Sequence, residues 1–105
     1  VTLRSLTLVS VEEELVIPTA VELLAPYPNP FNSTTTLGFV SPDHRRVRLR
    51  ILNMLGQEIA CIFDGQAEPG RTTVSWNTSS SATGMYFVVL DSETNRRARK
   101  LILLK

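Results

Sequence analysis

The sequence has only one cysteine, one histidine and one tryptophan among its 105 residues. The single cysteine, Cys61, cannot form a disulfide within the chain, so the sequence leaves the redox compartment open. Cys61 stands in the apolar run 59–63 and is predicted to be a small buried residue. The single histidine, His44, lies beside Asp43 and outside any cluster with metal-ligand spacing, so we interpret it as a solvated turn residue.

Long hydrophobic runs, a strong net charge and catalytic motifs are also missing. No apolar run approaches the ~20 residues that a membrane-spanning helix requires. A net charge of +1 provides no general attraction to nucleic acid or membrane. The serines at 79–81 lack a G-x-S-x-G motif, and Gly70 and Gly84 lie outside any phosphate-binding pattern. Asp91 and Glu93 fit a solvated hairpin loop better than an acid/base pair. Since no catalytic, phosphate-binding or metal-ligand motif remains, the sequence predicts no enzyme, no cofactor and no metal site.

The chain begins with Val1 rather than methionine, and we expect it to be a fragment or a processed product of a longer protein. Residues 1–24 are interpreted as a linker or the end of a preceding domain, with an edge strand at 21–24. Residues 25–105 are expected to form one domain with one core, since a domain of this size buries roughly 60% or more of its unfolded surface.

Short runs of alternating apolar and polar residues dominate the chain after residue 33. In the clearest run, Val47, Leu49 and Ile51 alternate with arginines. Six or seven such runs recur at intervals of about ten residues, which favours an all-β, immunoglobulin-like β-sandwich of about seven short antiparallel strands. Residues 85–90 do not alternate and are expected to form a central strand buried on both faces. The predicted core aromatics are Phe31, Phe39, Phe63, Trp76 and Phe87.

The stretch Tyr27-Pro28-Asn29-Pro30-Phe31 is stiff and non-helical. Each proline fixes its own φ at about −65° and pushes the preceding residue toward an extended or turn conformation. We interpret this stretch as a structural latch at the start of the β domain. The rings of Tyr27 and Phe31 are expected to pin the chain to the edge of the sandwich, and the latch itself is expected to recognise nothing.

Basic residues concentrate in two places, at Arg46, Arg48 and Arg50 and at Arg96 and Arg97. If the two strands share a sheet, these arginines could form a patch that docks an anionic partner. The alternative, which we favour, is a solvated outer face that suppresses edge pairing. Nucleic acid is not an expected partner, because no aromatic residues interleave with these charges on the exposed face.

The order of five motifs in residues 25–105 resembles a known family. Each motif alone is weak evidence, but five in this order and at this spacing are specific. They are Y-P-N-P-F-N at 27–32, V-R-L-R-I-L-N-M-L-G-Q-E-I at 47–59, P-G followed by V-S-W at 69–76, G-M-Y-F at 84–87 and R-K-L-I-L-L-K at 99–105. The chain resembles the C-terminal sorting domain of type IX secretion substrates, which has an immunoglobulin-like β-sandwich fold.

The resemblance implies a non-catalytic module at the C-terminus of a Bacteroidetes enzyme or adhesin, exported through the periplasm to the cell surface or secreted. In that family the outer-membrane translocon recognises the domain. A sortase-like peptidase commonly cleaves just upstream, while the cargo is joined to anionic lipopolysaccharide. The resemblance places the cargo before Val1 and any cleavage site in the linker before Tyr27. The translocon-recognition residues that it implies are Gly84, Met85, Tyr86, Arg99, Lys100, Leu101, Ile102, Leu103, Leu104 and Lys105.

Two residues depart from the family pattern. Ser33 replaces a common proline and is expected to loosen the turn, whereas Asn53 replaces a common aspartate and keeps its hydrogen-bonding ability. A second resemblance, to the immunoglobulin-like part of flagellar hook-capping proteins, rests on the leucine-glycine turn and the glycine-x-tyrosine strand. The alternative function is an accessory carbohydrate-binding or spacer β-sandwich of a secreted multidomain enzyme, with Tyr27 and Tyr86 as the candidate sugar-binding aromatics.

Overall fold

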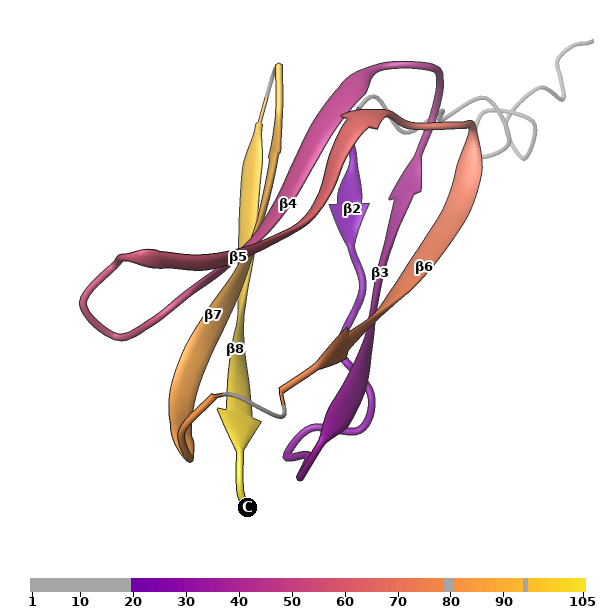
Figure 1. Ribbon diagram of the computed structural model, residues 1–105. Helices are drawn as coiled ribbons and strands as arrows, with labels where there is room; N and C mark the ends of the chain where they lie inside the picture. Colours follow the sequence, from indigo (N-terminus) through magenta and orange to yellow (C-terminus); the bar gives the residue numbers. More distant parts are fainter. Residues whose placement is uncertain (1–19, 79–80, 94) are drawn as a thin grey trace, which may run out of the picture.

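The computed structural model describes residues 20–78, 81–93 and 95–105. Within these ranges the chain forms seven strands and no helix, so no described segment is a helix that could cross a membrane. The strands form two sheets (Figure 1), and every pairing between strands is antiparallel. The predicted all-β sandwich is confirmed. The strands are β2 (Glu22–Leu23), β3 (Thr34–Ser41), β4 (Arg46–Leu52), β5 (Glu58–Gln66), β6 (Gly70–Asn77), β7 (Gly84–Ser92) and β8 (Arg96–Leu103).

The core lies between a four-stranded sheet of order β5-β4-β7-β8 and a three-stranded sheet of order β2-β3-β6. Side chains alternate between the two faces of each strand. In β4, therefore, Val47, Leu49 and Ile51 are buried while Arg46 and Arg48 are exposed, as the sequence predicts. The same alternation directs apolar side chains of both sheets into the interior. The larger apolar residues that are fully buried there are Val21, Leu37, Phe39, Val47, Leu49, Ile51, Val88, Leu90, Leu101 and Leu103.

The described chain enters the smaller sheet through β2. Val21 and Leu23 are buried, and Glu22 and Leu23 pair with Val40 and Phe39 of β3. An edge strand is therefore present within the expected stretch 21–24, but it covers only Glu22 and Leu23. The preceding linker, up to residue 19, lies outside the described residues.

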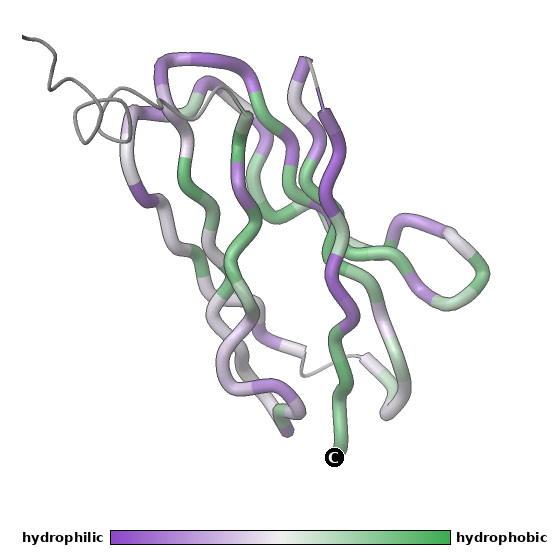
Figure 2. Tube along the Cα trace, turned by 180° about the vertical axis from the view of Figure 1, so that it is seen from behind, coloured by the Kyte–Doolittle hydropathy of each residue, from purple (hydrophilic) through white to green (hydrophobic). Residues whose placement is uncertain are grey.

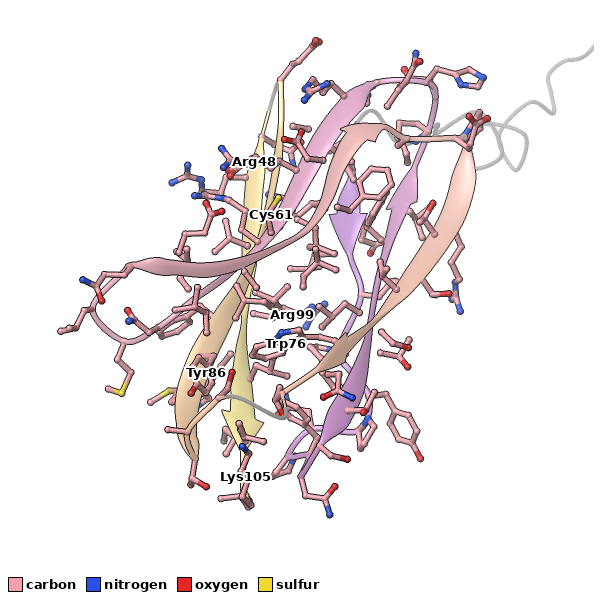
Figure 3. All side chains as sticks on the ribbon, in the orientation of Figure 1. Arg48, Cys61, Trp76, Tyr86, Arg99 and Lys105 are labelled. Atoms are coloured by element: carbon pink, nitrogen blue, oxygen red, sulfur yellow. The ribbon has the colours of Figure 1, made fainter. Side chains whose placement is uncertain are left out.

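An aromatic cluster joins the two sheets. The ring centroids of Phe31 and Trp76 lie 5.8 Å apart, and those of Trp76 and Tyr86 lie 5.7 Å apart in an edge-on arrangement. All three rings are buried. Trp76 comes from β6 and Tyr86 from β7, so the cluster spans the layers (Figure 3). Each such ring pair adds roughly 0.5–1.5 kcal/mol beyond simple burial.

Cys61 is exposed, so the prediction that it is buried is wrong. Its strand, β5, lies at the edge of the larger sheet. A register shift in the β4–β5 pairing places Cys61 opposite Arg50, on the outer face. An apolar run is therefore not evidence of burial where a register shift turns one of its side chains to the outer face, which no other described layer covers.

Phe87 also lies outside the core, which corrects its assignment as a core aromatic. It is partly exposed and pairs with Leu52 and Lys100 on the outer face of the larger sheet. Val89 is buried, but Met85 is partly exposed like Phe87. The prediction that both faces of residues 85–90 are buried is therefore wrong at these two positions, because no other described layer covers that face.

The β4–β5 hairpin projects from the body of the sandwich (Figure 1). Its turn is organised by Asn53, whose Oδ1 accepts hydrogen bonds from the main-chain N–H groups of Leu55 and Gln57, both at 2.9 Å. Asn53 Nδ2 donates to Gln57 Oε1 at 2.9 Å. Gly56 has a φ of 83°, which favours glycine. An aspartate could accept the first two bonds but could not donate the third, so Asn53 retains and extends the expected hydrogen bonding.

Candidate functional site

The two segments that the family resemblance marks for recognition lie side by side. In the β7–β8 pairing, Gly84 lies opposite Leu103, Met85 opposite Ile102 and Tyr86 opposite Leu101. These pairs are at the end of the sandwich where the chain reaches its C-terminus (Figure 1). The fold therefore brings residues 84–86 and 101–103 together as one two-stranded ribbon.

The latch, Tyr27–Phe31, lies along the other edge of the same ribbon. Asn29 Nδ2 donates to the Lys100 carbonyl, and Asn29 Oδ1 accepts from the Ile102 N–H, both at 3.0 Å. Phe31 continues the pairing: its N–H donates to the Ile102 carbonyl at 3.0 Å, and its carbonyl accepts from the Leu104 N–H at 2.8 Å. The end of β8 is thus hydrogen-bonded on both sides, and the sequence prediction of a latch at the sandwich edge gains a specific partner.

The two aromatic rings of the latch behave differently. Phe31 is 4% exposed and belongs to the core, as predicted, where its ring packs against Trp76. The Tyr27 side chain is 79% exposed, so the prediction that its ring pins the chain is wrong. Tyr27 is held instead by its main chain, which exchanges two hydrogen bonds with Thr36. The main-chain pairing with Thr36 directs the Tyr27 side chain outward, where its polar hydroxyl is exposed to solvent.

Further hydrogen bonds join the latch and the residues after it to the smaller sheet. The Pro28 carbonyl accepts a hydrogen bond from Thr35 Oγ1 at 2.8 Å. Past the latch, the Ser33 carbonyl accepts from both the N–H and the Oγ1 of Thr78, at 2.8 and 2.9 Å. Thr78 is fully buried. The segment around Ser33 is therefore held through its main chain to the end of β6.

Replacing Asn29 by alanine will destabilise the domain by about 1–2 kcal/mol, because it removes two hydrogen bonds that each contribute about 0.5–1.5 kcal/mol. Urea unfolding of the full chain measures the change. Asn32→Ala is the matched control, since the exposed Asn32 side chain makes no hydrogen bond to a described residue. Equal loss of stability in both variants would contradict the role given to Asn29.

Residues 99–105 divide into two sets by the alternation of β8. Leu101 and Leu103 are fully buried between the sheets. Lys100 and Ile102 point to the outer face, and Leu104 is 53% exposed beyond the strand end. Arg99 lies on the inward side, opposite Val88, where its Nε donates to the Leu23 carbonyl at 2.9 Å and ties β8 to the other sheet (Figure 3).

Tyr86 is buried, and its hydroxyl donates a hydrogen bond to the Ala82 carbonyl. It therefore holds the loop before β7 and has no exposed ring for a sugar to stack on. Of the two aromatics nominated for carbohydrate binding, only Tyr27 is on the surface. A flat platform of several exposed aromatics is absent from the described part of the chain.

Four of the five arginines of the predicted anionic-partner patch share the outer face of the larger sheet, and each is matched by an acidic residue. The sequence interpretation missed these partners, although Asp64 and Glu58 follow on the next strand. The ion pairs are Arg46–Asp64 at 2.6 Å, Arg48–Glu58 at 3.1 Å, Arg50–Asp91 at 2.7 Å and Arg96–Asp91 at 2.5 Å. Arg97 lies opposite the buried Leu90, so it belongs to the other face.

Asp91 sits between Arg50 and Arg96 and is the most enclosed of these acids. Burial alone would raise the pKa of its carboxyl group, but hydrogen bonds from Arg96 and Arg50 outweigh that effect and hold the pKa below its ordinary value. The carboxylate therefore stays ionised at neutral pH and offsets the local positive charge. The ion pairs of Asp91 stabilise the fold fully at a pH above the ordinary pKa of the carboxyl group. This stabilisation is lost as the pH falls through the lowered pKa of the folded state.

Other groups with chemical potential are dispersed. His44 lies in an exposed turn with Nδ1 3.6 Å from a Glu68 carboxylate oxygen. Ser79 and Ser80 lie outside the described residues. Among the residues that the structure does describe, no three His, Cys, Asp or Glu side chains are grouped closely enough to hold a metal ion.

Comparison with family models matches residues 25–104 to the secretion system C-terminal sorting domain. The chain belongs to this family. No curated protein and no solved structure gives a significant match. Membership means that the sorting domain acts as a C-terminal signal for type IX secretion, interacts with that machinery and directs its protein to the cell surface or out of the cell. Domains of this family are in general non-catalytic.

Proposed function

We propose that the outer-membrane type IX translocon recognises this sorting domain at the ribbon of residues 84–86 and 101–103, together with the flanking residues Arg99, Lys100, Leu104 and Lys105. The single observation that carries the proposal is the convergence of both segments with the latch at one end of the sandwich. Within the ribbon, Leu101 and Leu103 would shape the site from inside, since they are buried. The contacts to the translocon would come from Lys100, Ile102 and the residues that follow β8.

The cargo is proposed to precede Val1, and residues 25–105 are proposed to act as the sorting module. A sortase-like peptidase would cleave in the linker before Tyr27 and join the cargo to anionic lipopolysaccharide. The latch supports this placement, because its hydrogen bonds tie residues 27–31 to the end of the module. Since β2, at Glu22–Leu23, pairs with β3 within the sandwich, cleavage upstream of β2 would leave the fold whole. The mass of the mature protein at the cell surface tests it, since a mature form that still contains residues 27–105 would exclude cleavage there.

The export role is tested by fusing the full 105-residue chain to the C-terminus of an inert periplasmic reporter in a type IX-competent host. The intact chain is expected to carry the reporter to the surface or the medium. Deletion of Lys100–Lys105 is expected to retain it in the periplasm. A reporter that remains periplasmic with the intact chain would overturn the proposed function.

Deletion also removes part of the fold, so a charge reversal separates recognition from stability. Lys100 points outward, and the hydrogen bond that it accepts from Asn29 uses only its main chain. Lys100→Glu is therefore expected to lower export while leaving thermal unfolding unchanged. Arg71→Glu is the matched control, because Arg71 is an exposed cation on the smaller sheet. Equal export by both variants would remove Lys100 from the proposed contact.

A further inference from the structure

The tip of the β4–β5 hairpin presents two large apolar side chains to solvent. Met54 is 66% exposed and Leu55 is 82% exposed. Figure 2 shows hydrophobic colour at the end of this hairpin, where it stands away from the sandwich. Neither side chain contributes to the core, so folding of the domain does not explain their apolar character.

The tip is held rigidly rather than left as a loose loop. Besides the three side-chain bonds of Asn53, the Asn53 N–H donates to the Gln57 carbonyl at 2.9 Å, and the Gly56 N–H donates to the Asn53 carbonyl at 3.0 Å. A main chain that is already held in its bound conformation loses little conformational entropy on binding. The turn therefore presents Met54 and Leu55 together at the tip, in position to enter a pocket.

Apolar side chains continue from the hairpin onto the outer face of the larger sheet. Leu52 pairs with Phe87, and Met85 pairs with Ile102 on the same face. All four are partly exposed. We call these residues the outer strip. Single exposed apolar residues are normal on a protein surface, but a contiguous group marks an interaction site.

Charge indicates the kind of partner. Residues 51–57 carry no charged side chain, and Glu58, which follows, is paired with Arg48 and Arg50. Lys100 lies beside Phe87 in the outer strip and forms no ion pair within the described residues. A tip without basic residues is unsuited to an anionic membrane surface. The surface instead fits a protein that offers an apolar pocket with an acidic group at its rim.

We propose that the hairpin tip, Met54 and Leu55, together with the outer strip, forms the docking surface for a receptor protein of the type IX machinery. This inference rests on the proposed function. It adds the hairpin tip, Leu52 and Phe87 to the contact, whereas Met85 and Ile102 belong both to the outer strip and to the segments proposed above. The tip enters an apolar pocket of the receptor. The outer strip packs on the surface beside that pocket, and Lys100 pairs with an acidic side chain there.

The test uses the same reporter fusion with a Met54→Ser, Leu55→Ser double variant. Loss of both anchors is expected to weaken receptor binding about tenfold or more and to slow export accordingly. Thermal unfolding of the purified chain is expected to stay unchanged, because both side chains are exposed. Arg71→Ser is the matched control, since it removes an exposed large side chain from the smaller sheet, away from the hairpin tip, and is expected to be exported normally.

The outcomes separate this inference from the function on which it rests. If the unsubstituted fusion is not exported, the proposed function fails. If it is exported and the double variant, folded, is exported at the same rate, the docking surface is wrong while the function stands. A photo-crosslinking residue at position 55 supplies the direct measurement: a crosslink to an outer-membrane component of the machinery supports the proposal. Crosslinks only to lipid or to a second copy of the chain overturn it.

Discussion

The Trp76→Ala variant is expected to lose about 3–5 kcal/mol of unfolding free energy, which is a large share of the stability of a small domain. Trp76 is the ring between Phe31 of the latch and Tyr86 of β7, so its removal opens a cavity and breaks two ring contacts at once. Urea unfolding followed by tyrosine fluorescence or circular dichroism measures the loss, because the variant lacks the only tryptophan.

Phe87→Ala is the control for this result. Phe87 is also aromatic and lies in a strand of the sandwich, but it is partly exposed on the outer face. Its truncation should therefore cost clearly less than that of Trp76. A similar loss for both variants would mean that the aromatic cluster does not hold the C-terminal end of the fold together.

Leu101→Ala is expected to destabilise the domain by about 2–5 kcal/mol, the usual range for truncating a buried leucine. Leu101 is fully buried and lies opposite Tyr86 in the ribbon. Chemical denaturation of the purified full chain measures the loss. In the export assay, the variant should fail in proportion to its unfolded fraction.

Ile102→Ala is the neighbouring control. Ile102 points to the outer face and is partly exposed, so its truncation should cost only about 1 kcal/mol. Its main-chain bonds to Asn29 and Phe31 are untouched by the substitution. If Leu101→Ala were as mild as Ile102→Ala, the division of the C-terminal segment into inward and outward residues would be incorrect.

The strands were predictable because their local pattern and their environment agree. In β4, the alternation of Val47, Leu49 and Ile51 with arginines matches a strand with one buried and one solvated face. The pattern fails where the environment is unusual. Cys61 is in an edge strand that changes register, and Phe87 faces outward from a strand that is central in its sheet.

The candidate site was predictable only as separate pieces. The two prolines indicate a stiff segment, but nothing local to Asn29 reveals that its partners are Lys100 and Ile102, 71 and 73 residues away. Likewise, an aromatic residue stands at each end of the latch, and the sequence does not distinguish the buried Phe31 from the exposed Tyr27. Pairing across a sandwich depends on the assembled fold, which a local pattern does not contain.

The charge pattern shows the same limit. Arg46, Arg48 and Arg50 can be placed on one face by their spacing, but their effective charge depends on which acids come to lie beside them. Asp91 reaches this face from a different strand and pairs with Arg50 and Arg96. The outer face of the larger sheet therefore carries a network of ion pairs and is not a uniformly cationic surface.

The hydrogen bonds between the latch and β8 have a consequence for the order of folding. Closing a loop of more than 70 residues costs more chain entropy than closing the short turns of the β4–β5 and β7–β8 hairpins. Contacts between such distant segments form slowly, whereas hairpins form quickly. The junction of latch and β8 is thus expected to form after the hairpins, so that the end of the domain proposed for export recognition is completed late in folding.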